Sequence, residues 1–167
     1  DDTSGNSFAG INDTTTLNFT AADVVAPILS STSPTDNATG VAAGANIVLT
    51  FNENVAAGSG NITLKKSSDN STVQAMAVGG ANVSISGAVV TINPTANLVS
   101  SQGYYVQVDA TAIDDASGNS FAGISDNTTL NFTAADSAGP ALASSSPADD
   151  ATDVAVDANI VLTFDEN

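Results

Sequence analysis

The sequence repeats itself at a fixed distance of 113 residues. The octapeptide SGNSFAGI at residues 4–11 returns at 117–124, and NIVLTF at 46–51 returns at 159–164. The first 54 residues align without a gap to the last 54, and 39 of these 54 positions are identical. Self-similarity at a fixed period indicates that one structural unit is used more than once. The 167 residues therefore hold about one and a half units.

The boundaries between units are predicted where the two copies differ most. The segment AADVVAP at residues 21–27, here called the first joint, matches AADSAGP at 134–140, the second joint. Mismatches are densest within and just after these segments, at residues 24–26, 28 and 30 of the first copy. The predicted organisation is the C-terminal end of a preceding repeat at 1–23, a complete repeat at 24–136 and the N-terminal part of a following repeat at 137–167. We expect the chain to be part of a longer tandem array.

Within the complete repeat, apolar and polar residues alternate with a period of two, which is typical of strands with one buried face. Clusters of Ser, Gly, Asn and Asp separate the runs, and Ser86-Gly87-Ala88 is predicted to turn a hairpin. The first run is bounded by prolines and is predicted to form an edge strand. The series predicts an all-β fold, an antiparallel β-sandwich. The predicted strands lie at residues 27–33, 47–51, 62–64, 72–78, 83–86, 89–93, 104–108 and 128–133.

The same residues carry a resemblance to a known family. The segment SPTDNATGV at 33–41, followed by NIVLTFNEN at 46–54, resembles the start of bacterial immunoglobulin-like repeats. The segments DASGN at 115–119 and LNFT at 130–133 resemble the later part of such repeats. The resemblance implies an immunoglobulin-like sandwich of the kind found in S-layer proteins and giant secreted adhesins. It also implies an extracellular spacer role, often with calcium at the joints.

The charge of the chain limits its partners. It carries 18 acidic and two basic residues, a net charge of −16, and it has neither His nor Cys. This charge repels nucleic acid and anionic membrane surfaces. The lack of His and Cys excludes disulfides, thiol nucleophiles and Ser-His-Asp chemistry, and no apolar run reaches the roughly 18–20 residues of a membrane span. We expect no catalysis, no nucleic-acid binding and no direct membrane insertion.

The acidic residues favour a hard cation at the joints. Sixteen of the 18 are Asp, and the only two Glu, Glu53 and Glu166, occupy equivalent positions in the two repeats. In a sandwich of this kind, the loops after Phe51 and after Val108 return to the end that receives the linker. Oxygen ligands from several loops suit Ca²⁺, which takes about six to eight of them. The predicted ligands are Asp23, Glu53, Asp109, Asp114 and Asp115 at the first joint, and Asp136 and Glu166 at the second.

Other interpretations of these residues stay open. Loop acids also form turns in solvent without a metal, and the pattern does not distinguish Ca²⁺ from another hard cation. The repeats are interpreted as spacers of an extracellular adhesin or fibre that contact neighbouring repeats of the same chain. Alternatively, they associate laterally with other copies, or bind glycan or ice through polar rows such as Thr14-Thr15-Thr16. Tyr104 or Tyr105 is predicted to be a corner tyrosine that packs and hydrogen-bonds locally.

Overall fold

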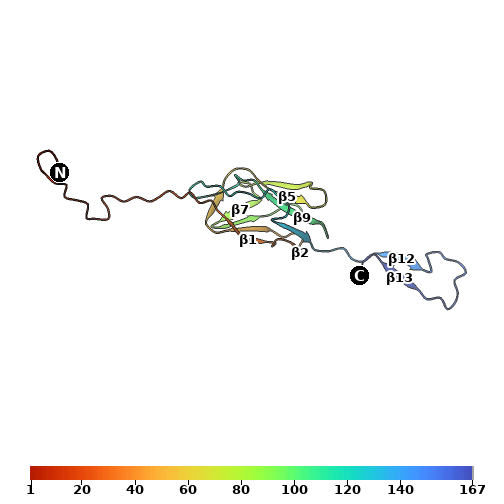
Figure 1. The fold of residues 1–167 in the computed structure, drawn as a ribbon. Coiled ribbons are helices and arrows are strands. Elements are labelled where there is room, and N and C mark those ends of the chain that lie inside the picture. The colour runs from red at the N-terminus through yellow and green to blue at the C-terminus, as the bar shows by residue number, and fades with distance from the viewer. Residues whose placement is uncertain (167) are drawn as a thin grey trace.

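The computed structural model describes residues 1–166 and is all-β. Eleven strands form a sandwich, a further hairpin follows it, and residues 1–22 extend from the opposite end (Figure 1). The described residues hold no helix, and so none that could cross a membrane. The strands are β1 (Leu29–Ser33), β2 (Ala38–Val41), β3 (Ile47–Phe51), β4 (Val55–Ala57), β5 (Asn61–Lys66), β6 (Thr72–Ala77), β7 (Val83–Ser86), β8 (Val89–Ile92), β9 (Gly103–Val108), β10 (Ile113–Asp115), β11 (Asn131–Ala134), β12 (Leu142–Ser146) and β13 (Val161–Phe164).

Two main sheets enclose the core. One has the strand order β1-β3-β8-β7, and the other has the order β2-β11-β9-β5-β6. The pairs are antiparallel apart from β2 with β11, which run parallel. A small third sheet pairs β4 with β10. The chain folds this way because each main sheet has one apolar face, and the two faces can only leave water by packing on each other.

The alternation along β3 shows how the core forms. Ile47, Leu49 and Phe51 are at most 3% exposed, while the residues between them are only partly buried. Phe51 meets Phe121 edge to face, with ring centroids 5.2 Å apart. Full burial of an apolar side chain of this size contributes about 1.5–3 kcal/mol. The period of two in the sequence is therefore the pattern of the buried face.

The structure confirms the predicted strands and adds three short ones, β2, β4 and β10. The first strand lies at a sheet edge, and the turn between β7 and β8 has Gly87 at a left-handed φ of 59°, as expected for a tight hairpin. The last strand of the sandwich begins at Asn131, three residues later than predicted. It starts late because the Asp126 carboxylate accepts the amides of Thr128 and Thr129, at 2.8 and 2.7 Å.

The segments on either side of the sandwich keep some of its local structure without its core. In the hairpin, Leu142 pairs with Phe164, as Leu29 pairs with Phe51 in the sandwich. On the N-terminal side, Phe8 is 78% exposed, whereas the equivalent Phe121 is 8% exposed. These two phenylalanines have the same local sequence, so their difference in burial comes from the strands that surround them.

Candidate metal centre at the first joint

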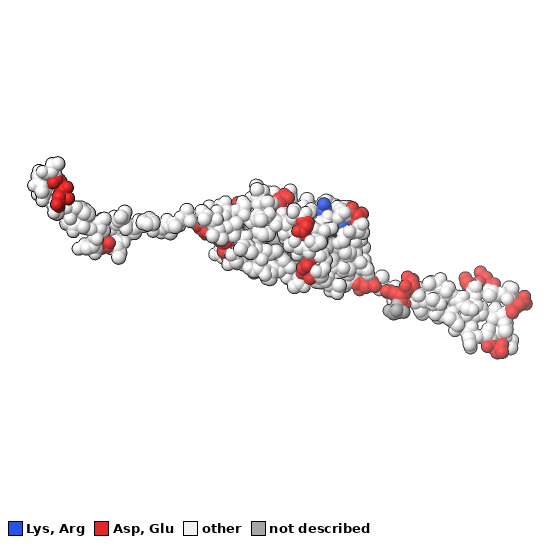
Figure 2. Space-filling model, in the orientation of Figure 1, with Lys and Arg blue, Asp and Glu red and all other residues white. Residues whose placement is uncertain are grey.

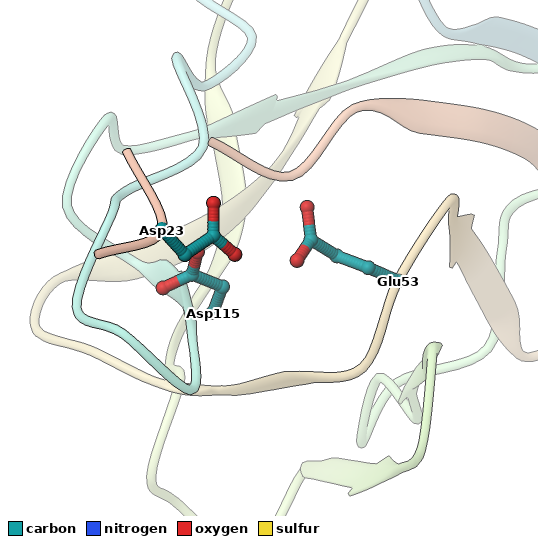
Figure 3. A group of neighbouring side chains, drawn as sticks. All are labelled: Asp23, Glu53 and Asp115. Atoms are coloured by element: carbon teal, nitrogen blue, oxygen red, sulfur yellow. The ribbon is translucent and has the colours of Figure 1, made fainter. Parts of the chain in front are cut away.

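Three carboxyl groups meet where the linker reaches the sandwich. Asp23 comes from the linker, Glu53 follows β3 and Asp115 ends β10, and one oxygen from each lies within 4.8 Å of the others. The carboxylates of Asp23 and Glu53 point toward each other, with Asp115 beside Asp23 (Figure 3). Asp23 is exposed, Glu53 is half-buried and Asp115 is buried. The group therefore runs from the surface of the linker into the end of the sandwich.

Asp115 is held in place by its own turn. Its Oδ1 accepts the amides of Ser117 and Asn119, both at 2.8 Å, and its Oδ2 accepts the side-chain amide of Asn119 at 2.7 Å. The side-chain bond from Asn119, followed by these backbone amides, holds the pKa of Asp115 below its ordinary value even though burial opposes this. Asp115 thus stays negatively charged although it is buried.

Asn119 also reaches the linker. Its side-chain amide lies 3.3 Å from the carbonyl oxygen of Asp23 and 3.4 Å from that of Val25. One amide thus gathers two linker carbonyls and the Asp115 carboxylate. No role was predicted for Asn119 from the sequence. The signal in the sequence is that this aspartate and asparagine recur four residues apart, as Asp2 and Asn6 in the first copy. The structure shows the same local bond there, from Asn6 to Asp2 at 3.0 Å.

The negative charges at this site oppose one another. Burial raises the pKa of Glu53, and the nearby charges of Asp115 and Asp23 raise it further. Like charges at this spacing repel, the more so where water is partly excluded. The two lysines, Lys65 and Lys66, belong to β5 and are not part of the group. A bound cation is what would relieve the repulsion.

The structure does not bring the predicted ligands Asp109 and Asp114 into this group. Asp109 follows β9, and its Oδ2 accepts the amide of Asn61 at 2.8 Å. Asp114 precedes Asp115 in β10, and neighbouring side chains of a strand point to opposite faces. Its Oδ1 accepts the hydroxyl of Ser120 at 2.6 Å instead. Both carboxylates therefore bind the sandwich's own donors.

The sequence of the folded unit also decides its family. The profile of the bacterial Ig-like domain family matches residues 23–134 and matches again at 136–167. The chain belongs to the bacterial Ig-like domain family. Domains of this family are typically non-catalytic. The two matches meet at the second joint, so the Ig-like pattern begins again there.

Three solved structures are similar to this chain at low sequence identity. Two crystal structures of the S-layer protein SbsC, one of a long fragment and one of its N-terminal part, are 18% and 19% identical over 71% of this chain, each with a TM-score of 0.44. The match spans only 15% and 25% of those chains. CopC from Methylosinus trichosporium OB3b is 18% identical over 68% of this chain and 97% of its own, with a TM-score of 0.46. No curated protein matches the chain.

The second joint of the Ig-like chain repeats part of the first. The amide of Ala138 donates to Asp136 Oδ1 at 3.0 Å, as that of Val25 donates to Asp23 Oδ1 at 3.0 Å. The Ser100 hydroxyl and then the Ala138 amide hold the pKa of Asp136 below its ordinary value, and the side chain of the neighbouring Glu166 lowers this pKa further. Within residues 1–166, Glu166 Oε1 is the buried side-chain oxygen without a hydrogen-bond partner. Acidic side chains also gather where the chain leaves the sandwich (Figure 2). The structure thus brings the predicted pair of this joint together.

Proposed function

We propose that this chain supplies non-catalytic spacer units to a long bacterial cell-surface protein, such as an adhesin or a surface fibre. The units follow one another at 113 residues, and calcium bound at each joint stiffens the array. The observation that carries the proposal is the convergence of Asp23, Glu53 and Asp115 at the linker. The renewed family match after the second joint supports the tandem arrangement.

The donor set at the first joint suits calcium. Carboxylate oxygens come from the linker, from the segment after β3 and from β10, and Ca²⁺ accepts such ligands at flexible geometry. Asp23, Glu53 and Asp115 would hold the ion there. At the second joint the unpartnered Glu166 Oε1 beside Asp136 supports the same role for that equivalent pair.

A cation at this position has a mechanical consequence. Domains joined by a linker move relative to one another by default unless their interface is large and apolar. An ion held by Asp23 on one side and by Glu53 and Asp115 on the other ties the linker to the sandwich. The tie removes freedom at the joint, and an array of such joints reaches further from the cell than a freely jointed one.

The experiment that tests the proposal is thermal unfolding of the whole chain in millimolar Ca²⁺, in Mg²⁺ and in excess EDTA. An ion that binds only the folded protein stabilises it, by about 2.7 kcal/mol when its concentration is 100 times the dissociation constant. We expect a rise of the midpoint that is specific to Ca²⁺ and is lost in Glu53→Gln.

The matched control is Asp69→Asn. Asp69 Oδ1 accepts the amide of Ser71 in the β5–β6 turn, at 2.9 Å, and asparagine keeps that acceptor while it removes one charge. Asp69→Asn should retain the full calcium effect. An unchanged midpoint in the unmodified chain, or an equal rise in Glu53→Gln, would refute the calcium site.

Lateral self-association is a second candidate function. The edge strand β6 of the five-stranded sheet favours it, because an edge strand offers unpaired backbone groups to another copy. Calcium would also reduce the repulsion between copies that each carry a charge of −16. Sedimentation velocity with Ca²⁺ and with EDTA tests this function, and a monomer at every concentration in both buffers would exclude it.

A further inference from the structure

The linker that leaves the sandwich is hydrogen-bonded to it beyond the last strand. The amide of Ala135 donates to the carbonyl of Val41 at 2.7 Å. The hydroxyl of Ser100 then makes two bonds, because it accepts the amide of Ser137 at 2.9 Å and donates to Asp136 Oδ1 at 2.8 Å. The outgoing linker is thus tied to its own unit as far as Ser137.

The loop that carries Ser100 is itself held by the core. The amide of Val99 donates to the hydroxyl of Tyr104 at 2.8 Å, and the Tyr104 ring is buried against Phe132. Two residues before Ser100, the amide of Leu98 donates to the carbonyl of Ala43 at 2.8 Å. Ser100 therefore stands on a fixed loop, and its bonds locate the linker relative to the whole sandwich.

The two joints show complementary sides of one arrangement. At the first joint, Asp23 faces the unit that follows it, through Glu53 and Asp115. At the second joint, the equivalent Asp136 is bound by the unit that precedes it, through Ser100. We propose that in this protein Ser100 acts as a latch, so that each linker aspartate is shared by the two Ig-like units that it joins.

A carboxylate has enough acceptor positions for both tasks. Asp136 uses Oδ1 for the Ser100 hydroxyl and for the amide of Ala138, so its Oδ2 takes part in neither of these two bonds. A cation at the joint would then position the preceding unit as well as the linker. This part of the inference rests on the proposed function, whereas the Ser100 bonds require no metal.

The test is the mobility of the second joint in the whole 167-residue chain, measured by ¹⁵N relaxation in excess EDTA. In the unmodified protein, we expect the amides of Ser137 and Ala138 to have order parameters near those of rigid backbone, about 0.85, and in Ser100→Ala to fall below about 0.6. Ser100→Thr keeps the hydroxyl and should restore the order. The thermal midpoint of the sandwich should change little in either variant.

The matched control is Ser84→Ala, at an exposed position of β7, which should leave both amides ordered. The latch is refuted if Ser100→Ala leaves these amides as ordered as the control does, or if they are already mobile in the unmodified protein in EDTA. Repeating the measurement in Ca²⁺ separates the two proposals. If the latch works in EDTA and millimolar Ca²⁺ shifts no amide resonance at either joint, the calcium site is refuted and the latch is kept.

Discussion

The hydroxyl of Tyr104 accepts the backbone amide of Val99 across 2.8 Å, from a side chain that is 1% exposed. Its ring stacks on Phe132 with the centroids 6.0 Å apart. The residue is thus a corner tyrosine, as the sequence predicted, whose bond fixes the loop beside the second joint. Tyr105 is also buried, but its hydroxyl donates to Asn70 Oδ1 at 3.1 Å, in the β5–β6 turn.

Tyr104→Phe removes one hydrogen bond from the core edge. We expect the free energy of unfolding, measured in urea, to fall by about 1 kcal/mol, the usual net contribution of such a bond. Tyr105→Phe should cost a similar amount. Only Tyr104→Phe should also raise the mobility of the Ser137 amide, because only Tyr104 holds the loop of Ser100. The same mobility in both variants would contradict this role.

Glu53→Gln should have opposite effects with and without calcium. The pKa of Glu53 is raised above its ordinary value of 4.5, first by burial and then by Asp115 and Asp23. With a raised pKa, the contribution of the group to stability is complete at a pH below its pKa in the unfolded chain. That contribution is lost as the pH rises through its pKa in the folded protein. In EDTA at pH 7, Glu53→Gln should therefore unfold at a higher temperature than the unmodified chain, with the difference vanishing near pH 4.

In saturating Ca²⁺ the unmodified chain should be the more stable of the two, since the variant lacks one of the calcium ligands. Calcium at 100 times its dissociation constant stabilises the unmodified protein by about 2.7 kcal/mol, and the variant should lose part of this. The measurement is the thermal midpoint from pH 4 to pH 8 in both buffers. A variant that is less stable in EDTA at pH 7 would show that the acidic group is not strained without a metal.

Asp126 should contribute stability to the sandwich that is lost at low pH. The amides of Thr128 and Thr129, followed by the Thr129 hydroxyl, lower the pKa of Asp126 to about 2. A lowered pKa contributes stability above the unfolded value near 3.8, and that stability is lost as the pH falls through about 2. Asp126→Ala should thus be less stable than the unmodified chain at pH 7, and the difference should shrink between pH 4 and pH 2.

Urea unfolding from pH 7 to pH 2 measures this difference, with Asp149→Ala as the control. A difference that is constant with pH would contradict the assignment.

Gly10 and Gly123 are equivalent and have φ angles of 84° and 80°. A Cβ at Gly123 would lie 2.5 Å from the carbonyl oxygen of Val108 and 2.9 Å from the amide nitrogen of Ala110, whereas at Gly10 it would meet nothing within 4 Å. Gly123→Ala should lower the free energy of unfolding by more than the roughly 1–2 kcal/mol of left-handed strain alone. Gly10→Ala should leave the unfolding of the sandwich unchanged in urea, and similar losses in both would show that the clash is relieved.

The sequence predicted the longer strands because each has a buried face, which alternation reveals. It did not predict β2, β4 or β10, which have three or four residues each and owe their pairing to distant segments. The candidate site could be predicted only in part for the same reason. Asp114 and Asp115 are neighbours in β10, and only the direction of the pleat, set by pairing with β4, sends Asp115 toward Glu53. Nothing in the sequence marked Ser100, because its partners lie in the linker 36 and 37 residues further on.

The repeat allows local and tertiary effects to be separated within one chain. Asp2 Oδ1 accepts the amides of Ser4 and Asn6 at 2.9 Å, just as Asp115 Oδ1 accepts those of its own turn at 2.8 Å. The first turn lies outside the sandwich and the second within it. The sequence by itself determined these turns, because every donor is at most four residues from its acceptor.

Burial and the convergence of carboxylates were decided only by the tertiary structure. Phe8 and Phe121 share their local sequence, yet only Phe121 is covered, because the strands that pack on it come from elsewhere in the chain. Asp23 and Asp115 likewise meet although they are 92 positions apart in the sequence. A hydrogen bond within a turn needs no partner beyond its neighbours. A core, and a site with ligands from three segments, forms only when the whole sandwich closes.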